Sequence, residues 1–280
     1  MTNKTLSLTI VIPAYNEQDY LAACLDSIAA QTVKPKQVLV VDNNSTDNSL
    51  KIAESYKFVR VIKESRQHQS FAQKTGFDAA TADIIGRIDA DTILPVDWVE
   101  NTLEYFAEHQ SVAGITSSSL PYDVSIAAAG TKVFKFYIDL ASRLAGSRML
   151  WGANCAVRRS AWQKISDQVM TRGDIWEDFD LSFCLARHGQ TVFIDDLAVG
   201  SSIRAVRRSL ISQTRYQFRA VRTFYYRAGL PRTALFLMLW STLYLFFIPV
   251  MLDKYILSPL ANLVRTGRLR RPEVVPLEAE

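Results

Sequence analysis

The feature that most constrains this chain is a regular alternation between Leu8 and His109, where short apolar runs are separated by segments with helical spacing. The apolar runs have the length of buried strands and cover residues 8–12, 38–41, 59–62 and 84–88. Helices are expected to follow them, ending near Tyr56, covering 71–80 and covering 95–109. Strands that alternate with helices predict an α/β fold with a mostly parallel, doubly wound sheet flanked by helices.

Polar side chains follow three of these runs at the point where each run ends. Asn16 and Glu17 follow the first run, Asp42 follows the second, and Asp89 and Asp91 follow the fourth. The carboxyl ends of parallel strands meet at one edge of a sheet, which is where ligands bind in open α/β folds. Two carboxylates two residues apart repel each other unless they share a cation or a donor, and a hard divalent ion carrying a diphosphate is the natural guest. A solvated acidic turn is the alternative.

The same segments, with two more downstream, resemble glycosyltransferase family 2, whose members have the GT-A fold. The resemblance covers about residues 6–200 and is carried by five motifs in the family's order: VIPAYNE at 11–17, VVDNNSTD at 40–47, DAD at 89–91, WGANCAVRR at 151–159 and EDFDLS at 177–182. It implies a Rossmann-like central sheet and a nucleotide-diphosphate sugar as donor, with UDP favoured and GDP left open.

The resemblance assigns the nucleotide to the first two strand ends. Asp42 would accept a hydrogen bond from a ring N–H of the base, which uracil and guanine both offer. Pro13, Ala14 and Tyr15 would line the base pocket, and Glu17 would lie near the base or the ribose. For Tyr15, ordinary packing is an equal alternative.

The diphosphate and the donor sugar fall to later positions. Asp91 would ligate Mn²⁺ or Mg²⁺, and Asp89 would face the ribose or the water shell of the metal, which neutralises the diphosphate as it leaves. Lys74 would contact a phosphate, unless it is a surface lysine. Gly152 and Asn154 would form the floor of the sugar pocket, where a glycine permits close approach. An asparagine that bonds to loop backbone is the structural alternative for Asn154.

The pair Glu177-Asp178 would supply the base that withdraws the proton from an acceptor hydroxyl. In the family's motif the aspartate usually has this role, so Asp178 is expected to be the base and Glu177 its support. Attack from the side opposite the leaving diphosphate inverts the anomeric centre. Asp180 is expected to open the next helix, and Trp176 either stacks on a sugar or belongs to the core.

Charge and cysteine content narrow the setting. Eight arginines and no acid or lysine lie between Leu197 and Arg232. The net charge of the whole chain is +4, so the rest of the chain carries about −4. A basic, aromatic-rich neck favours a membrane surface over nucleic acid, for which no recognised module is present. Three widely spaced cysteines match no zinc pattern and favour a reducing compartment.

The C-terminal third is expected to associate with a membrane. A helix over 209–226 places arginines on one face and apolar residues on another, and the uncharged stretch 234–252 has basic flanks on both sides. Such flanks fit a single crossing poorly, so an in-plane or re-entrant helix, or a crossing completed by a partner, is favoured. The proposed organisation is a donor half at 1–115, an acceptor half at 116–205, membrane-associated helices at 206–271 and a disordered tail at 272–280.

Together these observations predict an inverting, metal-dependent glycosyltransferase at the cytoplasmic face of the cell membrane. Its acceptor would be a hydroxyl or phosphate, on a lipid-linked molecule or a cell-envelope glycan. The alternatives are a nucleotidyltransferase and a non-catalytic membrane protein that binds nucleotide sugars. The first of these usually begins with a glycine-rich basic phosphate loop, which the segment 14–17 is not.

Overall fold

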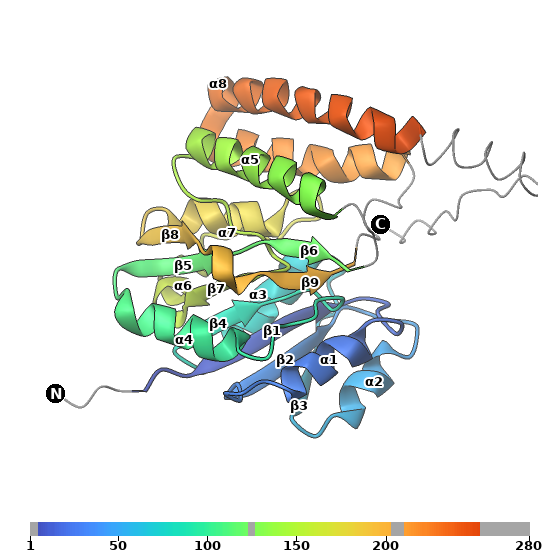
Figure 1. Cartoon of the computed structure of the whole chain (residues 1–280), viewed down its shortest axis with the longest axis vertical. Helices are drawn as coiled ribbons and strands as arrows, with labels where there is room; N and C mark the ends of the chain where they lie inside the picture. The colour runs from blue at the N-terminus through green and yellow to red at the C-terminus, as the bar shows by residue number, and fades with distance from the viewer. Residues whose placement is uncertain (1–4, 123–126, 203–209, 253–280) are drawn as a thin grey trace, which may run out of the picture. The chain divides into compact units, whose positions relative to one another are not determined.

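The structure is a computed structural model that describes residues 5–122, 127–202 and 210–252 (Figure 1). It divides into two units, 1–203 and 204–280, which are described separately. The predicted division of the first unit at 115/116 stays a prediction, and the predicted tail at 272–280 lies outside the described residues.

The first unit is built on a seven-stranded sheet in the order β3-β2-β1-β4-β7-β5-β8. All neighbouring pairs are parallel except those of β7, which is antiparallel to both β4 and β5. The strands are β1 (Leu8–Ala14), β2 (Gln37–Asp42), β3 (Val59–Lys63), β4 (Ile84–Arg87), β5 (Val112–Thr116), β7 (Cys155–Arg158) and β8 (Gln190–Phe193). The predicted α/β class with a mostly parallel sheet is therefore confirmed.

Helices cover both faces of this sheet (Figure 1). The helices of the first unit are α1 (Leu21–Ala29), α2 (Ser49–Ser55), α3 (Gln69–Ala79), α4 (Trp98–Glu108), α5 (Ala127–Ala145), α6 (Arg159–Ile165) and α7 (Glu177–Leu185). One core cluster joins Ile10 and Ile12 of β1 to α1, α2 and α4, and the other joins Val11 to α3, α6 and α7. The central strands are thus buried on both faces, which explains why they read as continuous apolar runs.

A second, two-stranded sheet pairs β6 (Ser119–Pro121) with β9 (Val199–Ser201), and the short 3₁₀ helix η1 (Asp195–Leu197) precedes β9. The small sheet is joined to the turn after β4 by a bridge between Ile93 and Gly200.

Two local features determine what packs against the central strands. Gly76 lets α3 lie directly on β1, because a Cβ there would be 2.3 Å from Cγ1 of Val11. The antiparallel β7 has its first residue, Cys155, paired with Arg87 at the end of β4. The segment that precedes β7 therefore arrives at the carboxyl ends of the parallel strands.

The second unit contains α8 (Leu210–Leu252), which is broken at Gly229, where φ is 77° and ψ is 174°. The rings of Phe224 and Phe236 stack with centroids 3.9 Å apart. Twelve residues of straight helix would separate them by about 18 Å, so the two halves of α8 fold back on each other. In the described part of the chain, no helix is sufficiently long and apolar to cross a membrane.

Candidate active site

The loops after β1 and β2 lie side by side at the carboxyl edge of the sheet. Ala14 is the register partner of Asp42, and Asn43 N–H donates to Ala14 O at 2.8 Å. The carboxylate of Asp42 is largely buried, and its Oδ1 accepts a hydrogen bond from Ser45 N–H at 3.1 Å. Pro13 and Ala14, which the motif assigns to the base pocket, therefore adjoin Asp42.

The two loops are fastened by side-chain hydrogen bonds. Oδ1 of Asn16 accepts from Thr46 N–H at 2.8 Å, Ser45 Oγ accepts from Asn16 N–H at 3.1 Å, and Ser49 Oγ accepts from Glu17 N–H at 2.6 Å. Asn16 has a φ of 54°, in the left-handed region that asparagine tolerates. These bonds fix the position of Glu17, which lies beside Asn16 in the same loop.

The acids of the first and fourth strand ends surround one buried thiol. Burial, and after it the charges of Asp91, Asp89 and Glu17, raise the pKa of Cys24. Cys24 Sγ also donates to Asp89 O, with the two atoms 3.7 Å apart. Glu17, Asp89 and Asp91 thus all act electrostatically on the same buried thiol.

The candidate base Asp178 and its neighbour Glu177 lie in the first turn of α7, which begins at Glu177. The carboxylate of Asp178 accepts from Gly152 N–H at 3.0 Å and from its neighbour Phe179 N–H at 2.9 Å. Burial, followed by the charge of Asp178, raises the pKa of Glu177 to about 7. Burial also raises the pKa of Asp178, against the opposing effects of Arg87 and of the Gly152 N–H.

Arg87, which the sequence analysis passed over, joins these two groups of carboxylates. Its Nη2 lies 2.9 Å from Oδ1 of Asp89 and 3.2 Å from Oε1 of Glu177, and the residue is 1% exposed. Burial works against its charge, but Asp89 and Glu177 outweigh it and raise the pKa of Arg87. The signal in the sequence was a charged residue inside an otherwise apolar strand.

Gly152 is needed by this arginine. A Cβ at position 152 would lie 1.0 Å from Nη1 of Arg87, so only glycine leaves room for the guanidinium. The same residue donates its N–H to Asp178, and the loop before β7 therefore contacts both the arginine and the candidate base.

Two other predicted site residues make structural contacts. Asn154 accepts from Trp98 Nε1 at 3.0 Å and donates to Leu197 O at 2.7 Å, which favours the alternative of an asparagine that holds loops. Lys74 donates to Asp78 at 2.7 Å and lies over the ring of Trp162, so these contacts are within α3 and with α6 rather than with the strand-end acids.

The structure also shows where Asp180 and Trp176 lie. Asp180 does not cap α7, which begins at Glu177, but lies in its first turn, where its Oδ2 accepts from Met170 N–H at 2.7 Å and holds the preceding loop. Trp176 is 5% exposed and packs edge-to-face on Phe179, with ring centroids 4.9 Å apart. Its place is therefore in the core beside the base.

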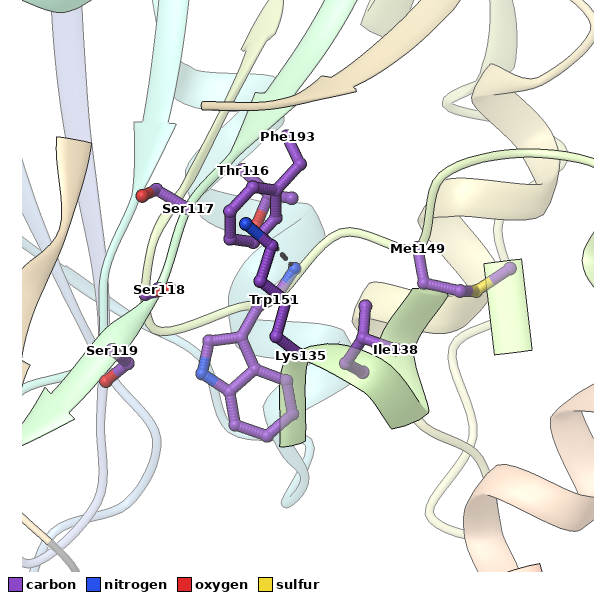
Figure 2. A pocket seen from close by; sticks show the side chains of 9 residues that line it. All are labelled: Thr116, Ser117, Ser118, Ser119, Lys135, Ile138, Met149, Trp151 and Phe193. Carbon is purple, nitrogen blue, oxygen red and sulfur yellow. Dashed lines mark hydrogen bonds between the residues drawn. The ribbon is translucent and has the colours of Figure 1, made fainter. Parts of the chain in front are cut away.

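A pocket that is open to solvent lies next to the Gly152 loop (Figure 2). Its apolar walls come from Ile138, Met149, Trp151 and Phe193, and the rest comes from 116–119 and Lys135. Thr116 Oγ1 accepts from Trp151 N–H at 2.9 Å, the dashed line in Figure 2. Because Trp151 precedes Gly152, this pocket adjoins the residue that holds Asp178.

The strand-end acids fit part of a divalent metal site. Within the described residues, no group of three or more His, Cys, Asp or Glu side chains is arranged to hold a metal. Asp89 and Asp91 supply hard oxygen ligands of the kind that Mg²⁺ and Mn²⁺ accept, and such ions often take their remaining ligands from water and phosphate. The residues therefore suit a cation that arrives with an anionic ligand.

Two solved sugar transferases are similar in structure to this chain. A mannosyltransferase from Pyrobaculum calidifontis, solved with GDP-Man and Mn²⁺, is 19% identical with a TM-score of 0.57, covering 90% of this chain and 81% of its own. Glucosyl-3-phosphoglycerate synthase from Mycobacterium tuberculosis, solved with Mn²⁺, UDP and phosphoglyceric acid, is 17% identical with a TM-score of 0.60, covering 81% and 80%. At such identities the likeness shows the fold, and the expected relation to GT-A structures is confirmed.

The sequence itself gives the family. The profile described as glycosyl transferase family 2 matches residues 9–166, more than half of the chain, and the chain belongs to this family. An uncharacterized glycosyltransferase of Nostoc sp. is 26% identical over 196 residues, which is 66% of this chain and 61% of the relative. One from Escherichia coli K12 is 34% identical over 95 residues, 32% of this chain and 28% of the relative. The chain thus matches less than two thirds of the length of either relative.

Proposed function

We propose that this protein transfers a sugar from a nucleoside-diphosphate donor to an acceptor hydroxyl or phosphate, with inversion at the anomeric carbon. The observation that carries the proposal is the junction of the two predicted groups of acids: Asp89 and Glu177, 88 positions apart in sequence, bind the same buried Arg87. This shared contact supports a single site for the proposed donor and base residues, in a chain of glycosyl transferase family 2.

The nucleotide would bind across the loops after β1 and β2. Asp42 retains Oδ2 for a ring N–H of the base, since its Oδ1 accepts from Ser45. Pro13, Ala14 and Tyr15 would form the wall beside the base, and Glu17 would contact the base or ribose. Both UDP and GDP-Man occur in the structural relatives, so UDP is proposed as the donor nucleotide with GDP as its rival.

The diphosphate would lie at the end of β4. Asp91 and Asp89 would hold Mn²⁺ or Mg²⁺, which supplies Lewis-acid neutralisation of the departing diphosphate. The chain itself orients the Asp89 carboxylate, since Gln69 Nε2 donates to its Oδ1 at 3.3 Å, and it holds the main chain at Asp91, whose carbonyl O accepts from Tyr122 OH at 3.2 Å.

Asp178 would be the general base. Its two backbone N–H contacts orient the carboxylate, and the burial that raises its pKa makes it a better proton acceptor than an exposed aspartate. It would take the proton of the acceptor as the acceptor oxygen attacks the anomeric carbon. Glu177 would support it through Arg87. The pocket beside Trp151 would receive the acceptor, because it adjoins the loop that holds Asp178.

We also propose that the second unit rests on the cytoplasmic surface of a membrane, where a lipid-linked or cell-envelope acceptor would be found. In α8, Arg215, Arg222 and Arg232 are exposed together with Leu230 and Met238, each of the last two 68% exposed. Basic and large apolar side chains exposed on one helical unit suit an anionic lipid surface.

The test of the transferase is a panel of nucleotide sugars with and without Mn²⁺. We expect one donor to raise the melting temperature only when Mn²⁺ is present, since binding to the folded state stabilises it, and to release nucleoside diphosphate when acceptors are added. Release of pyrophosphate from a sugar phosphate and a nucleoside triphosphate would instead show a nucleotidyltransferase. Binding without release under any acceptor would show a non-catalytic protein.

The membrane proposal is tested with the full chain and sedimented vesicles. Binding to vesicles with anionic lipid, weakened by salt and by the substitutions Arg215→Gln, Arg222→Gln and Arg232→Gln, is expected. The same substitutions should leave the melting shift with the nucleotide sugar unchanged. Equal binding to neutral and anionic vesicles, or none, would contradict it.

A further inference from the structure

Arg87 occupies a place for which the donor and base residues alone give no reason. It is the last residue of β4, its guanidinium is buried, and one nitrogen, Nη2, serves both Asp89 and Glu177. With Asp178 directly after Glu177, three carboxylates surround one positive charge. The cluster therefore carries excess negative charge before any ligand binds.

The hydrogen bonds of the guanidinium are also incomplete. Its Nε is buried and has no hydrogen-bond partner in the described part of the chain. The two carboxylates share the single nitrogen Nη2. A carboxylate that binds two guanidinium N–H groups at once makes a stronger pair than this. Neither carboxylate thus has an optimal bond, and removing one partner would leave the guanidinium free to bond better with the other.

Asp89 is the partner that a ligand would remove. Its side chain is 35% exposed, whereas that of Glu177 is 11% exposed, so solvent and a bound cation reach Asp89 first. A divalent ion and a guanidinium compete for the same carboxylate oxygens, since both are attracted by the same negative charge. Occupation of Asp89 by a cation would thus weaken its pairing with Arg87 and strengthen that with Glu177.

We propose that Arg87 is a positioning residue that couples donor binding to the base: it competes with the metal for Asp89 and, once displaced, secures Glu177 beside Asp178. The inference rests on the proposed function and adds an order of events, because Glu177 and Asp178 become fully held only after the donor and its cation bind. Gly152 leaves room for the Arg87 guanidinium because it has no Cβ, and its N–H donates a hydrogen bond to Asp178.

The test compares Mn²⁺ affinity with turnover in three variants. Arg87→Met removes the competitor, so we expect Mn²⁺ to bind more tightly, by about 3- to 30-fold, in the presence of saturating UDP. Turnover of the nucleotide sugar should nevertheless fall about 100-fold, because Glu177 loses the ion pair that positions it beside the catalytic base. A merely structural role would not move these two quantities in opposite directions.

Two further variants keep the test decisive if Arg87→Met fails to fold. Arg87→Lys keeps the charge without the fork of donors, so Mn²⁺ affinity should stay near that of the wild type while turnover falls. Glu177→Gln leaves Arg87 with Asp89 as its only charged partner of the two, so Mn²⁺ should bind more weakly. Arg66→Met is the matched control, since it removes another arginine–glutamate pair, 2.7 Å apart, outside the cluster.

Unchanged Mn²⁺ affinity in both Arg87→Met and Glu177→Gln would overturn the proposal, whatever happens to turnover, and so would a wild-type protein that binds no Mn²⁺ with UDP. The result is separable from the proposed function, because Mn²⁺ binding is measured without a sugar donor. A protein that shows the expected order of Mn²⁺ affinities but releases no nucleotide from any sugar donor would overturn only the transferase.

Discussion

The two ends of the candidate site are held by different forces. At the base end, formed by the loops after β1 and β2, backbone N–H groups bind side-chain oxygens of Asn16, Ser45 and Ser49. At the reacting end, Asp89, Glu177 and Asp178 crowd around a single buried arginine. The first end is a set of separate bonds, and the second is one electrostatic cluster.

This difference predicts how each end responds to change. Each bond at the base end contributes a modest amount on its own, and the loss of one leaves the others in place. In a buried cluster, removal of one charge changes the balance for every other member, because their attraction and repulsion are strong where water is scarce. Substitutions at the reacting end should therefore affect the rate, and those at the base end should affect donor binding.

The largest effect is expected from Asp91→Ala. If this carboxylate holds the cation that neutralises the diphosphate, turnover should fall by about 1000-fold or more, because Lewis-acid stabilisation is worth several kcal/mol. The measurement is release of nucleoside diphosphate at saturating Mn²⁺. Asp97→Ala, an exposed acid just before α4, is the control and should keep full activity. Turnover within tenfold of wild type would contradict the role of Asp91.

Asp178→Asn should come next, with a loss of turnover of about 100- to 10,000-fold, which is the range for general-base catalysis. The amide keeps one oxygen for Gly152 or Phe179, so the fold and the affinity for donor should be retained. Single-turnover kinetics and calorimetry with UDP separate the two quantities. The exposed Asp167, changed to Asn, is the control. Weakened donor affinity without loss of rate would contradict the assignment.

The sequence predicts the donor half of the fold well because its elements are defined locally. The buried face of α1, Leu21 to Ile28, follows directly from helical spacing, and the strand ends follow from where apolar runs stop. The direction of β7 does not follow, since four residues carry no sign of being antiparallel. Yet this direction is what carries Gly152 to Arg87.

The contacts that the sequence does not predict are those between residues that lie far apart along the chain. Asn16 bonds to Thr46, 30 positions away. Asn154 bonds to Trp98, 56 positions away. Arg87 lies in an apolar run, and nothing local shows that Glu177 will meet it. Hydrogen-bond partners of this kind are properties of the tertiary structure.

Two glutamates, Glu177 at the reacting end and Glu64 directly after β3, should differ in how pH affects the free energy of unfolding. Burial raises the pKa of Glu177 to about 7, so between its ordinary value and pH 7 the folded state binds more protons than the unfolded state. Stability from this residue is therefore present in acid and lost as pH rises to 7, by at most about 3 kcal/mol. Hydrogen bonds from Arg66 lower the pKa of Glu64 to about 2, so its stabilisation is instead present above pH 4.5 and lost as pH falls towards 2.

Urea unfolding at pH 3, 5 and 8 distinguishes these contributions. Glu177→Gln should remove a decline in stability between pH 5 and 8, and Glu64→Gln should remove a loss between pH 5 and 3. The two variants are controls for each other. A Glu177→Gln protein that declines between pH 5 and 8 as steeply as the wild type would contradict the raised pKa of Glu177.

The smallest effect is expected from Asn16→Gly, at the base end. Glycine adopts the positive φ of Asn16 without strain but lacks the Oδ1 that accepts from the N–H and the hydroxyl of Thr46, so the variant removes two hydrogen bonds that share one acceptor oxygen and little else. One net bond is worth about 1 kcal/mol, so the KM for donor should rise about fivefold while kcat stays within twofold. Asn16→Ala adds backbone strain at the same position, and the difference between the two variants measures that strain. A fall in kcat comparable to that of Asp178→Asn would show that the base end shares the charge cluster's influence on the rate, and the two ends could then no longer be treated as separate devices.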